Sequence, residues 1–282
     1  MQQLGNTSFD VIYKAFNLAF GNYEVQLSKN QLQSMLLRRG FDPDLSFAVF
    51  REDEIISFII NGVGCFNGVI SAYDTGTGTL EEFRGQGLAT QIFNYSLPYF
   101  KEMGIDQYVL EVLQHNHGAV SVYRKLGFET SREFNYFIAN RAEILSSLKE
   151  TSCSCSLSQI HLRDIMDLHT FWDFCPSWQN SCEAIQRAEE CFSIIGAYID
   201  GQIVGYCVFE PDSGDVTQIA VSHSIRRKGV GSKLFYEAAS QMTGDTLKVV
   251  NTDIACKSIT GFLTSKGLSV TGKQFEMIKC LN

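Results

Sequence analysis

The fold of this chain is decided by the stretch Thr77-Gly78-Thr79-Leu80-Glu81-Glu82-Phe83-Arg84-Gly85-Gln86-Gly87-Leu88-Ala89. Its beginning is typical of a strand, and the residues after Gly87 place apolar side chains on one helical face, so a strand, a glycine turn and a helix are expected. Gly85 and Gly87 lack a Cβ, so the backbone can turn tightly and direct several N–H groups toward a bound anion. The positive end of the helix dipole points to the same place. The stretch therefore predicts a cradle for a diphosphate.

A second copy of this pattern lies between Val216 and Gly231. Both loops fit the motif Arg-x-x-Gly-x-Gly/Ala, through Arg84, Gly87 and Ala89 and through Arg226, Gly229 and Gly231. Apolar residues at helical spacing follow the second loop as they follow the first. A lone Gly-x-Gly would be weak evidence, but its repetition indicates two related domains.

With these two loops, each half of the chain resembles the GCN5-related N-acetyltransferase (GNAT) superfamily, in which this loop grips the pyrophosphate of acetyl-coenzyme A. The resemblance implies an α/β fold with a mixed sheet, present as two tandem GNAT domains. We expect the first, catalytic domain at 1–148, a linker at 149–156 in a polar run of small residues, and a second domain at 157–282.

Local signals place several elements. Ser28-Lys29-Asn30-Gln31 is a capping box at the start of a helix. Asp200-Gly201 is suited to the tight turn of a hairpin between strands at 191–199 and 203–209. In the second half, helices are expected at 160–174 and 181–190.

The residues from Leu110-Glu111-Val112 to Gly127-Phe128 are similar to those of GNAT peptide N-terminal acetyltransferases. That resemblance implies that Glu111, twelve residues before Tyr123, acts as general base, and that Tyr123 donates its phenolic proton to the coenzyme A sulfur. Two alternatives for the strand glutamate stay open: it can simply face water, or a water relay can serve as the base.

The resemblance also implies two sets of acetyl-coenzyme A contacts. The first set comprises backbone groups along the pantetheine, the pyrophosphate loop and one amide side chain: Thr77, Gly78 and Thr79; Arg84, Gly85, Gln86, Gly87, Leu88, Ala89 and Thr90; and Asn116. The second set comprises the matching strand end and loop: Ile219, Ala220 and Val221; and Arg226, Arg227, Lys228, Gly229, Val230, Gly231 and Ser232.

The second half departs from the family pattern at the positions that carry chemistry. When Gly267-Leu268 is aligned with Gly127-Phe128, Leu263 takes the tyrosine position, Cys256 the Asn116 position and Asn251 the glutamate position. A leucine cannot donate a proton. The second domain is therefore expected to be degenerate as a catalyst, and either binds acetyl-coenzyme A without turnover, uses other residues or shapes the acceptor site.

Composition restricts the class of protein. The 282 residues are 45% hydrophobic and 19% charged, as in a globular protein, and the net charge of −8 argues against a nucleic-acid partner. Nine cysteines without paired ligand spacing are interpreted as reduced thiols of a cytoplasmic protein with no metal site. No secretory signal is recognised at Met1, and the most apolar stretch, 55–70, is too interrupted to cross a membrane.

The leading hypothesis is a cytoplasmic, acetyl-coenzyme A-dependent N-acetyltransferase that transfers acetyl to a primary amine by direct attack in a ternary complex. The acceptor would be a small molecule or a peptide, and the protein a monomer or homodimer. One alternative is a non-catalytic acyl-coenzyme A-binding regulatory or interaction protein. Another places catalysis in the C-terminal domain, with the N-terminal domain as scaffold.

Overall fold

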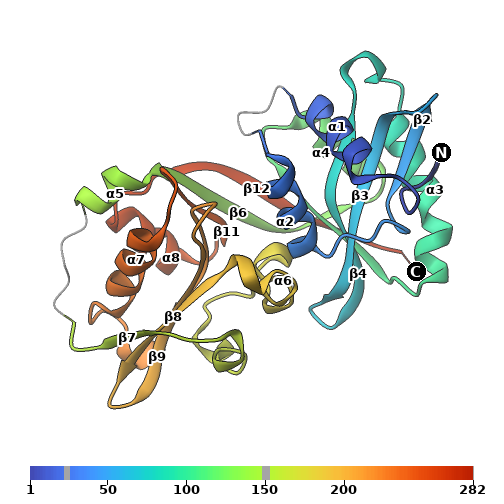
Figure 1. Ribbon diagram of the computed structural model, residues 1–282. Coiled ribbons are helices and arrows are strands. Elements are labelled where there is room, and N and C mark those ends of the chain that lie inside the picture. Colours follow the sequence, from blue (N-terminus) through green and yellow to red (C-terminus); the bar gives the residue numbers. More distant parts are fainter. Residues whose placement is uncertain (22–25, 148–152, 282) are drawn as a thin grey trace. The chain divides into compact units, whose positions relative to one another are not determined.

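The computed structural model describes residues 1–21, 26–147 and 153–281. The chain forms two compact units, drawn in Figure 1. Unit 1 comprises Met1–Ser131 and Phe275–Asn282, and unit 2 comprises Arg132–Gln274. Each unit is a mixed α/β structure with its own run of neighbouring strands and its own apolar core.

Unit 1 is built around a sheet with the strand order β1-β2-β3-β4-β5-β12. Its sheet is antiparallel from β1 to β4, and β5 joins β4 in parallel. Its elements are β1 (Gln2–Gln3), α1 (Phe9–Ala19), α2 (Lys29–Arg39), β2 (Phe47–Arg51), β3 (Glu54–Phe66), β4 (Val69–Thr79), η1 (Glu81–Phe83), α3 (Leu88–Glu102), β5 (Gln107–Leu113), α4 (His117–Lys125) and the end of β12 (Val270–Cys280).

Side-chain alternation along the strands of unit 1 gives the sheet two apolar faces. On β3, Phe58 and Ile60 pack with α1 and α2, whereas Ile59 packs with α3. The sheet therefore lies between two helical layers, and both layers bury apolar side chains against it. The capping box at Ser28 is confirmed, and Gly40 ends α2 in the left-handed conformation, with φ of 79°.

Unit 2 repeats this architecture with the strand order β12-β6-β11-β10-β9-β8-β7. Helices α7 and α8 cover one face, and the turns η2 and η3 and helix α6 pack on the other. Its elements are the end of β6 (Glu129–Asn140), α5 (Arg141–Ser147), β7 (Ser156–Gln159), η2 (Leu162–Asp164), η3 (Leu168–Phe171), η4 (Trp178–Asn180), α6 (Cys182–Arg187), η5 (Glu189–Cys191), β8 (Ser193–Ile199), β9 (Gln202–Glu210), β10 (Asp215–Val221), η6 (His223–Ile225), α7 (Val230–Gln241), β11 (Thr246–Asp253), α8 (Lys257–Ser265) and the start of β12.

The helix expected at 160–174 is replaced by two 3-10 turns, η2 and η3. The backbone N–H of Ile160 donates to Ile194 O on β8, so the segment begins as an extension of the sheet. Leu162 and Ile165 are buried three residues apart, which is the repeat of a 3-10 turn. Sheet pairing thus competes with the helix that the apolar spacing predicts.

The compact units divide the chain differently from the boundary expected at 148–157. Most of β6 belongs to unit 2, where Phe137 pairs with Val249 of β11, and the end of β12 belongs to unit 1, where Met277 joins the core. The two halves carry the same order of elements, so local sequence does not distinguish which unit receives each last strand. Residues 149–152 of the expected linker lie outside the described residues, and Ser156 already begins β7.

This division predicts which unit each final strand stabilises. Phe137 and Met277 are both fully buried, so Phe137→Ala should cost unit 2 about 3–5 kcal/mol and Met277→Ala should cost unit 1 about 2–5 kcal/mol. Amide hydrogen exchange read by mass spectrometry should accelerate in α7 for the first variant and in α3 for the second. Faster exchange in α3 for Phe137→Ala and in α7 for Met277→Ala would contradict the assignment of β6 to unit 2 and of the end of β12 to unit 1.

Candidate active site

Both units contain a pair of parallel strands that separate. In unit 1, β4 pairs with β5 over Ser71–Tyr73, and the rest of β4 pairs with β3 but has no register partner on β5 among the described residues. In unit 2, the parallel pair β10 and β11 is in register at Asp215 and Lys248. Each opening leaves one edge of a strand, Thr77–Thr79 or Ile219–Val221, free to bind an extended ligand.

The two predicted cradles have the same backbone conformation. The second and fourth residues of each loop are left-handed, with φ of 78° at Gly85 and 72° at Gly87, and of 64° at Arg227 and 88° at Gly229. Such a conformation is uncommon for a residue with a Cβ, so Arg227 shows that the loop geometry overrides the preference of its residue. Each loop then enters its helix at the end where the first N–H groups have no intrahelical acceptor.

The arginine that begins each cradle is engaged with the protein backbone. Arg84 donates through Nε to Thr79 O at 3.1 Å and through a terminal nitrogen to Ala19 O at 3.1 Å. Arg226 makes the equivalent bonds to Val221 O at 3.0 Å and Phe171 O at 2.9 Å. Both guanidinium groups therefore tie the strand end to an earlier segment of the chain, which fixes the loop that follows.

Unit 1 has a cavity of about 130 Å³ beside the strand opening. Tyr123 of α4 points into it and donates its hydroxyl to Asp74 Oδ2 of β4 at 2.9 Å. Thr77 Oγ1 donates to the same carboxylate oxygen at 2.7 Å. Apolar and aromatic side chains complete the lining: Ile59, Ala89, Phe93, Tyr108, Ala119, Val122 and Leu126.

Glu111 lies on the other face of β5. Its neighbours Leu110 and Val112 belong to the core under α3 and α4, so alternation directs Glu111 toward the α1–α2 side. There it interacts with the hydroxyl of Tyr73, whose pKa is raised well above its ordinary value by burial and then by the Glu111 charge. Glu111 is not among the described residues that line the cavity beside Tyr123.

Asn116 is the N-cap of α4. Its Oδ1 accepts from the backbone N–H of Ala119 at 3.2 Å, so this oxygen satisfies one of the helix's free donors. The side-chain nitrogen of Asn116 takes no part in this cap bond.

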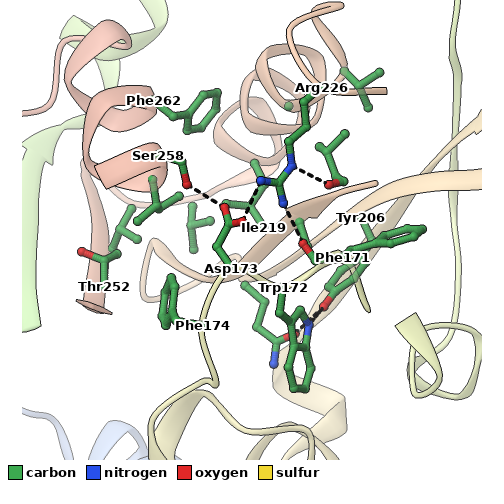
Figure 2. A pocket seen from close by; sticks show the side chains of 18 of the residues that line it. Phe171, Trp172, Asp173, Phe174, Tyr206, Ile219, Arg226, Thr252, Ser258 and Phe262 are labelled. Atoms are coloured by element: carbon green, nitrogen blue, oxygen red, sulfur yellow. Dashed lines mark hydrogen bonds and ion pairs between the residues drawn. The ribbon is translucent and has the colours of Figure 1, made fainter. Parts of the chain in front are cut away.

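Unit 2 has the larger opening, a cleft of about 470 Å³ between the second cradle and α8. Figure 2 shows Asp173 between the cradle and the helix, where its carboxylate accepts from Arg226 at 2.7 Å and from Ser258 at 2.6 Å. Burial opposes the charge of Asp173, but the bonds from Ser258 and Arg226 outweigh it and lower the pKa of this carboxyl. The wall beside it is aromatic, with Trp172 donating to the Tyr206 hydroxyl.

Three residues of unit 2 stand at the positions that the sequence alignment pairs with Asn116, Tyr123 and Glu111. Cys256 is the N-cap of α8, as Asn116 is of α4, and Leu263 is fully buried in the core. Asn251, at the glutamate position, is buried and donates to Ser177 Oγ at 2.9 Å. Within the described part of unit 2, the tyrosine position therefore offers no proton donor.

Sequence reasoning missed two site residues, Asp74 and Asp173. In a regular strand, Asp74 and Thr77 would point to opposite faces because they are three residues apart. A β-bulge in the pairing of β3 with β4, between the pairs Asn61–Asp74 and Ile60–Gly76, adds one residue and brings both side chains to the same face. No local signal marks this bulge, and Asp173 lies in the segment expected to be a helix.

The strand opening followed by a glycine cradle is present once in each unit, which is the arrangement expected of a tandem N-acyltransferase fold. The model of the acetyltransferase (GNAT) family matches residues 10–128 and 159–255. The chain therefore belongs to the acetyltransferase (GNAT) family.

Among curated relatives, N-alpha-acetyltransferase 30 of Schizosaccharomyces pombe is 32% identical over 98 residues, which are 34% of this chain and 65% of that protein. N-alpha-acetyltransferase MAK3 of Arabidopsis thaliana is 25% identical over 97 residues, which are 34% of this chain and 51% of that protein. The chain thus spans less than two thirds of the length of these relatives.

Solved structures share the fold of the whole chain. A tandem GNAT protein from the clavulanic acid biosynthesis pathway superposes with a TM-score of 0.73 at 10% identity, covering 100% of this chain and 97% of its own. A GCN5-related N-acetyltransferase from Sphaerobacter thermophilus has a TM-score of 0.70 at 13% identity, covering 100% of this chain and 95% of its own. At these identities the likeness establishes the tandem fold alone.

No helix in 1–21, 26–147 or 153–281 combines the length and apolar character needed to span a membrane. Across the same residues, no group of three or more His, Cys, Asp and Glu side chains is placed to bind a metal ion.

Proposed function

We propose that the protein is an acetyl-coenzyme A-dependent N-acetyltransferase whose chemistry takes place in unit 1. The observation that carries this proposal is the position of Tyr123, whose side chain lines the cavity beside the opening of β4 and β5. An acyl thioester bound along Thr77–Thr79, with its pyrophosphate on the cradle, would bring its sulfur toward that cavity.

The two faces of the sheet support direct attack in a ternary complex. Glu111 is directed toward the α1–α2 side, and Tyr123 reaches the opening from the α3–α4 side. An amine deprotonated by Glu111, or by a water that it orients, would attack the acyl carbonyl from one face, and Tyr123 would protonate the departing thiolate from the other. A backbone N–H at the end of β4 would stabilise the oxyanion.

The α-amino group of a peptide is the first acceptor to test. The two named relatives are N-alpha-acetyltransferases, and their alignments each span about a third of this chain. A small-molecule amine is the other acceptor class that fits an acetyltransferase of this family. Both classes present the neutral primary amine that the reaction requires.

Unit 2 is proposed to bind an acyl-coenzyme A without transferring the acyl group. Its cradle has the conformation of the first one, and its cleft is the larger of the two. Leu263 at the tyrosine position cannot protonate a thiolate. An intact cradle combined with a leucine at the tyrosine position favours a binding role for the second half of the chain.

The proposed function is tested by measuring thiol release from acetyl-coenzyme A with a panel of acceptors. Peptides with a free α-amino group should be acetylated, and the same peptides already acetylated at the N-terminus should not. If only small amines are acetylated, the acceptor is a small molecule and the peptide acceptor is ruled out. The absence of thiol release with every acceptor of both classes would contradict the transferase and favour an acyl-coenzyme A-binding protein.

A further inference from the structure

We infer that Asp74 is a positioning residue that holds the Tyr123 hydroxyl and returns a proton to it after each transfer to the thiolate. This inference rests on the proposed function of unit 1. It starts from the contact between the two side chains, in which Tyr123 Oη donates to Asp74 Oδ2 at 2.9 Å.

The backbone conformation of β4 places the side chain of Asp74 at this contact. Asp74 follows Tyr73, the last residue of β4 that is in register with β5, so it lies at the point where the two strands begin to separate. The bulge next to it allows Thr77 to donate to the same oxygen at 2.7 Å. Two donors on one carboxylate oxygen hold the group in a single orientation.

The surroundings make Asp74 easier to protonate than an ordinary aspartate. Burial raises the pKa of Asp74, although the bonds from Thr77 and Tyr123 and the charge of Arg39 act in the opposite direction. The ionisable groups that interact with Asp74 are Tyr123 from α4, Tyr108 from β5, Tyr73 on β4 and Arg39 from α2. Arg39 is the cation among them, and it also donates to Thr75 O at 3.0 Å.

The proton balance defines the role. When the carboxyl of Asp74 is protonated, its O–H donates to Tyr123 Oη, and the phenolic O–H is free to turn toward the cavity. As the C–S bond of the acyl-coenzyme A breaks, the thiolate takes the phenolic proton, and the phenolate takes the proton of the Asp74 carboxyl. The products are a thiol, a neutral Tyr123 and an ionised Asp74, which regains its proton from water before the next turnover.

This cycle gives a pH dependence with a definite sign. The competent form carries the proton on Asp74, so kcat should fall as the pH rises through the pKa of that carboxyl. The basic limb of the wild-type profile should therefore lie well below the range in which a phenol titrates, near 10. In Asp74→Asn the amide oxygen still accepts from Tyr123, but the side chain has no acidic proton to return.

The experiment compares wild type, Asp74→Asn, Tyr123→Phe and the double variant, with acetyl-coenzyme A and an acceptor that wild type turns over. We expect Asp74→Asn to lower kcat by roughly 10- to 100-fold, to change the KM for acetyl-coenzyme A little and to remove the basic limb. In the Tyr123→Phe background the same change should have no further effect, because Asp74 acts through the phenol.

Different failures are separable. Wild type that turns over no acceptor would overturn the proposed function itself. Active wild type with an unchanged kcat and pH profile in Asp74→Asn, or an additional loss in the double variant, would overturn only the role of Asp74. If Asp74→Asn does not fold, the wild-type profile still decides, because a kcat that stays constant up to the phenol range excludes proton return by this carboxyl.

Discussion

Tyr123→Phe should lower kcat by at least ~10²-fold, the lower end of what a positioned general acid contributes. The phenyl ring keeps the packing of Tyr123 against Phe128, whose ring centroid lies 5.6 Å away, so the variant removes little more than the hydroxyl. Without the hydroxyl, the thiolate would have to leave unprotonated or find a proton from water. The measurement is steady-state thiol release at saturating acetyl-coenzyme A and acceptor.

Two controls test whether the loss of kcat is due to the missing hydroxyl of Tyr123. Acetyl-coenzyme A affinity, measured by calorimetry, should stay within a few-fold of wild type, because the cradle and the strand end are untouched. Tyr95→Phe is a matched change on the half-exposed face of α3, where the hydroxyl of Tyr95 contacts that of Tyr99, and it should leave kcat unchanged. Wild-type kcat in Tyr123→Phe would exclude the tyrosine from the mechanism and return attention to unit 2.

Gly87→Asp should weaken acetyl-coenzyme A binding in unit 1 by about 10²-fold or more. A Cβ at Gly87 meets only Gln91 Nε2, at 3.9 Å, so the protein has room for the side chain. Aspartate adopts a left-handed conformation more readily than most residues, which keeps the backbone cost small. A new carboxylate about 4 Å from a pyrophosphate would be repelled by about 4 kcal/mol near a protein surface, and each ~1.4 kcal/mol is tenfold in affinity.

The chain supplies a matched control for this charge. Gly104, just beyond α3, also has a positive φ, of 67°, and a Cβ there meets nothing within 4 Å. Gly104→Asp should bind acetyl-coenzyme A as wild type does. An equal loss of affinity in both variants would show that the change in net charge, and not the cradle, is responsible.

The same design applied to unit 2 counts the binding sites. Calorimetry of wild type should give two sites per chain, of which Gly87→Asp removes one and Gly229→Asp the other. Gly201→Asp, in the hairpin of β8 and β9, is the control, because Gly201 has a φ of 76° and open space around its Cβ position. A single site that survives Gly229→Asp would mean that the cleft of unit 2 does not bind the cofactor.

Local chemistry made much of the fold predictable. The Ser28 capping box, the left-handed Gly40 and the hairpin turn at Asp200-Gly201 depend on residues within a few positions of one another, and the structure has all three. The two cradles also depend on adjacent residues. Because both occur in full in the sequence, the tandem organisation could be inferred without any tertiary information.

The contacts at the site could not be inferred in this way. Tyr123 and Asp74 are 49 residues apart, and Arg226 and Asp173 are 53 apart, so each pair meets only when the strands and helices between them are packed. The bulge that brings Asp74 and Thr77 to one face depends on how β3 pairs with β4. The residue types of the two strands do not by themselves fix that pairing.

The sequence by itself determined the family motif, the number of its copies and the loss of the tyrosine from the second copy at Leu263, because each of these is a matter of residue type at short spacing. Only the tertiary structure decided that most of β6 joins unit 2 and the end of β12 joins unit 1, and that a carboxylate holds the Tyr123 hydroxyl. Strand pairing and burial set these outcomes. Both are properties of the packed chain and cannot be deduced from residue types at short spacing.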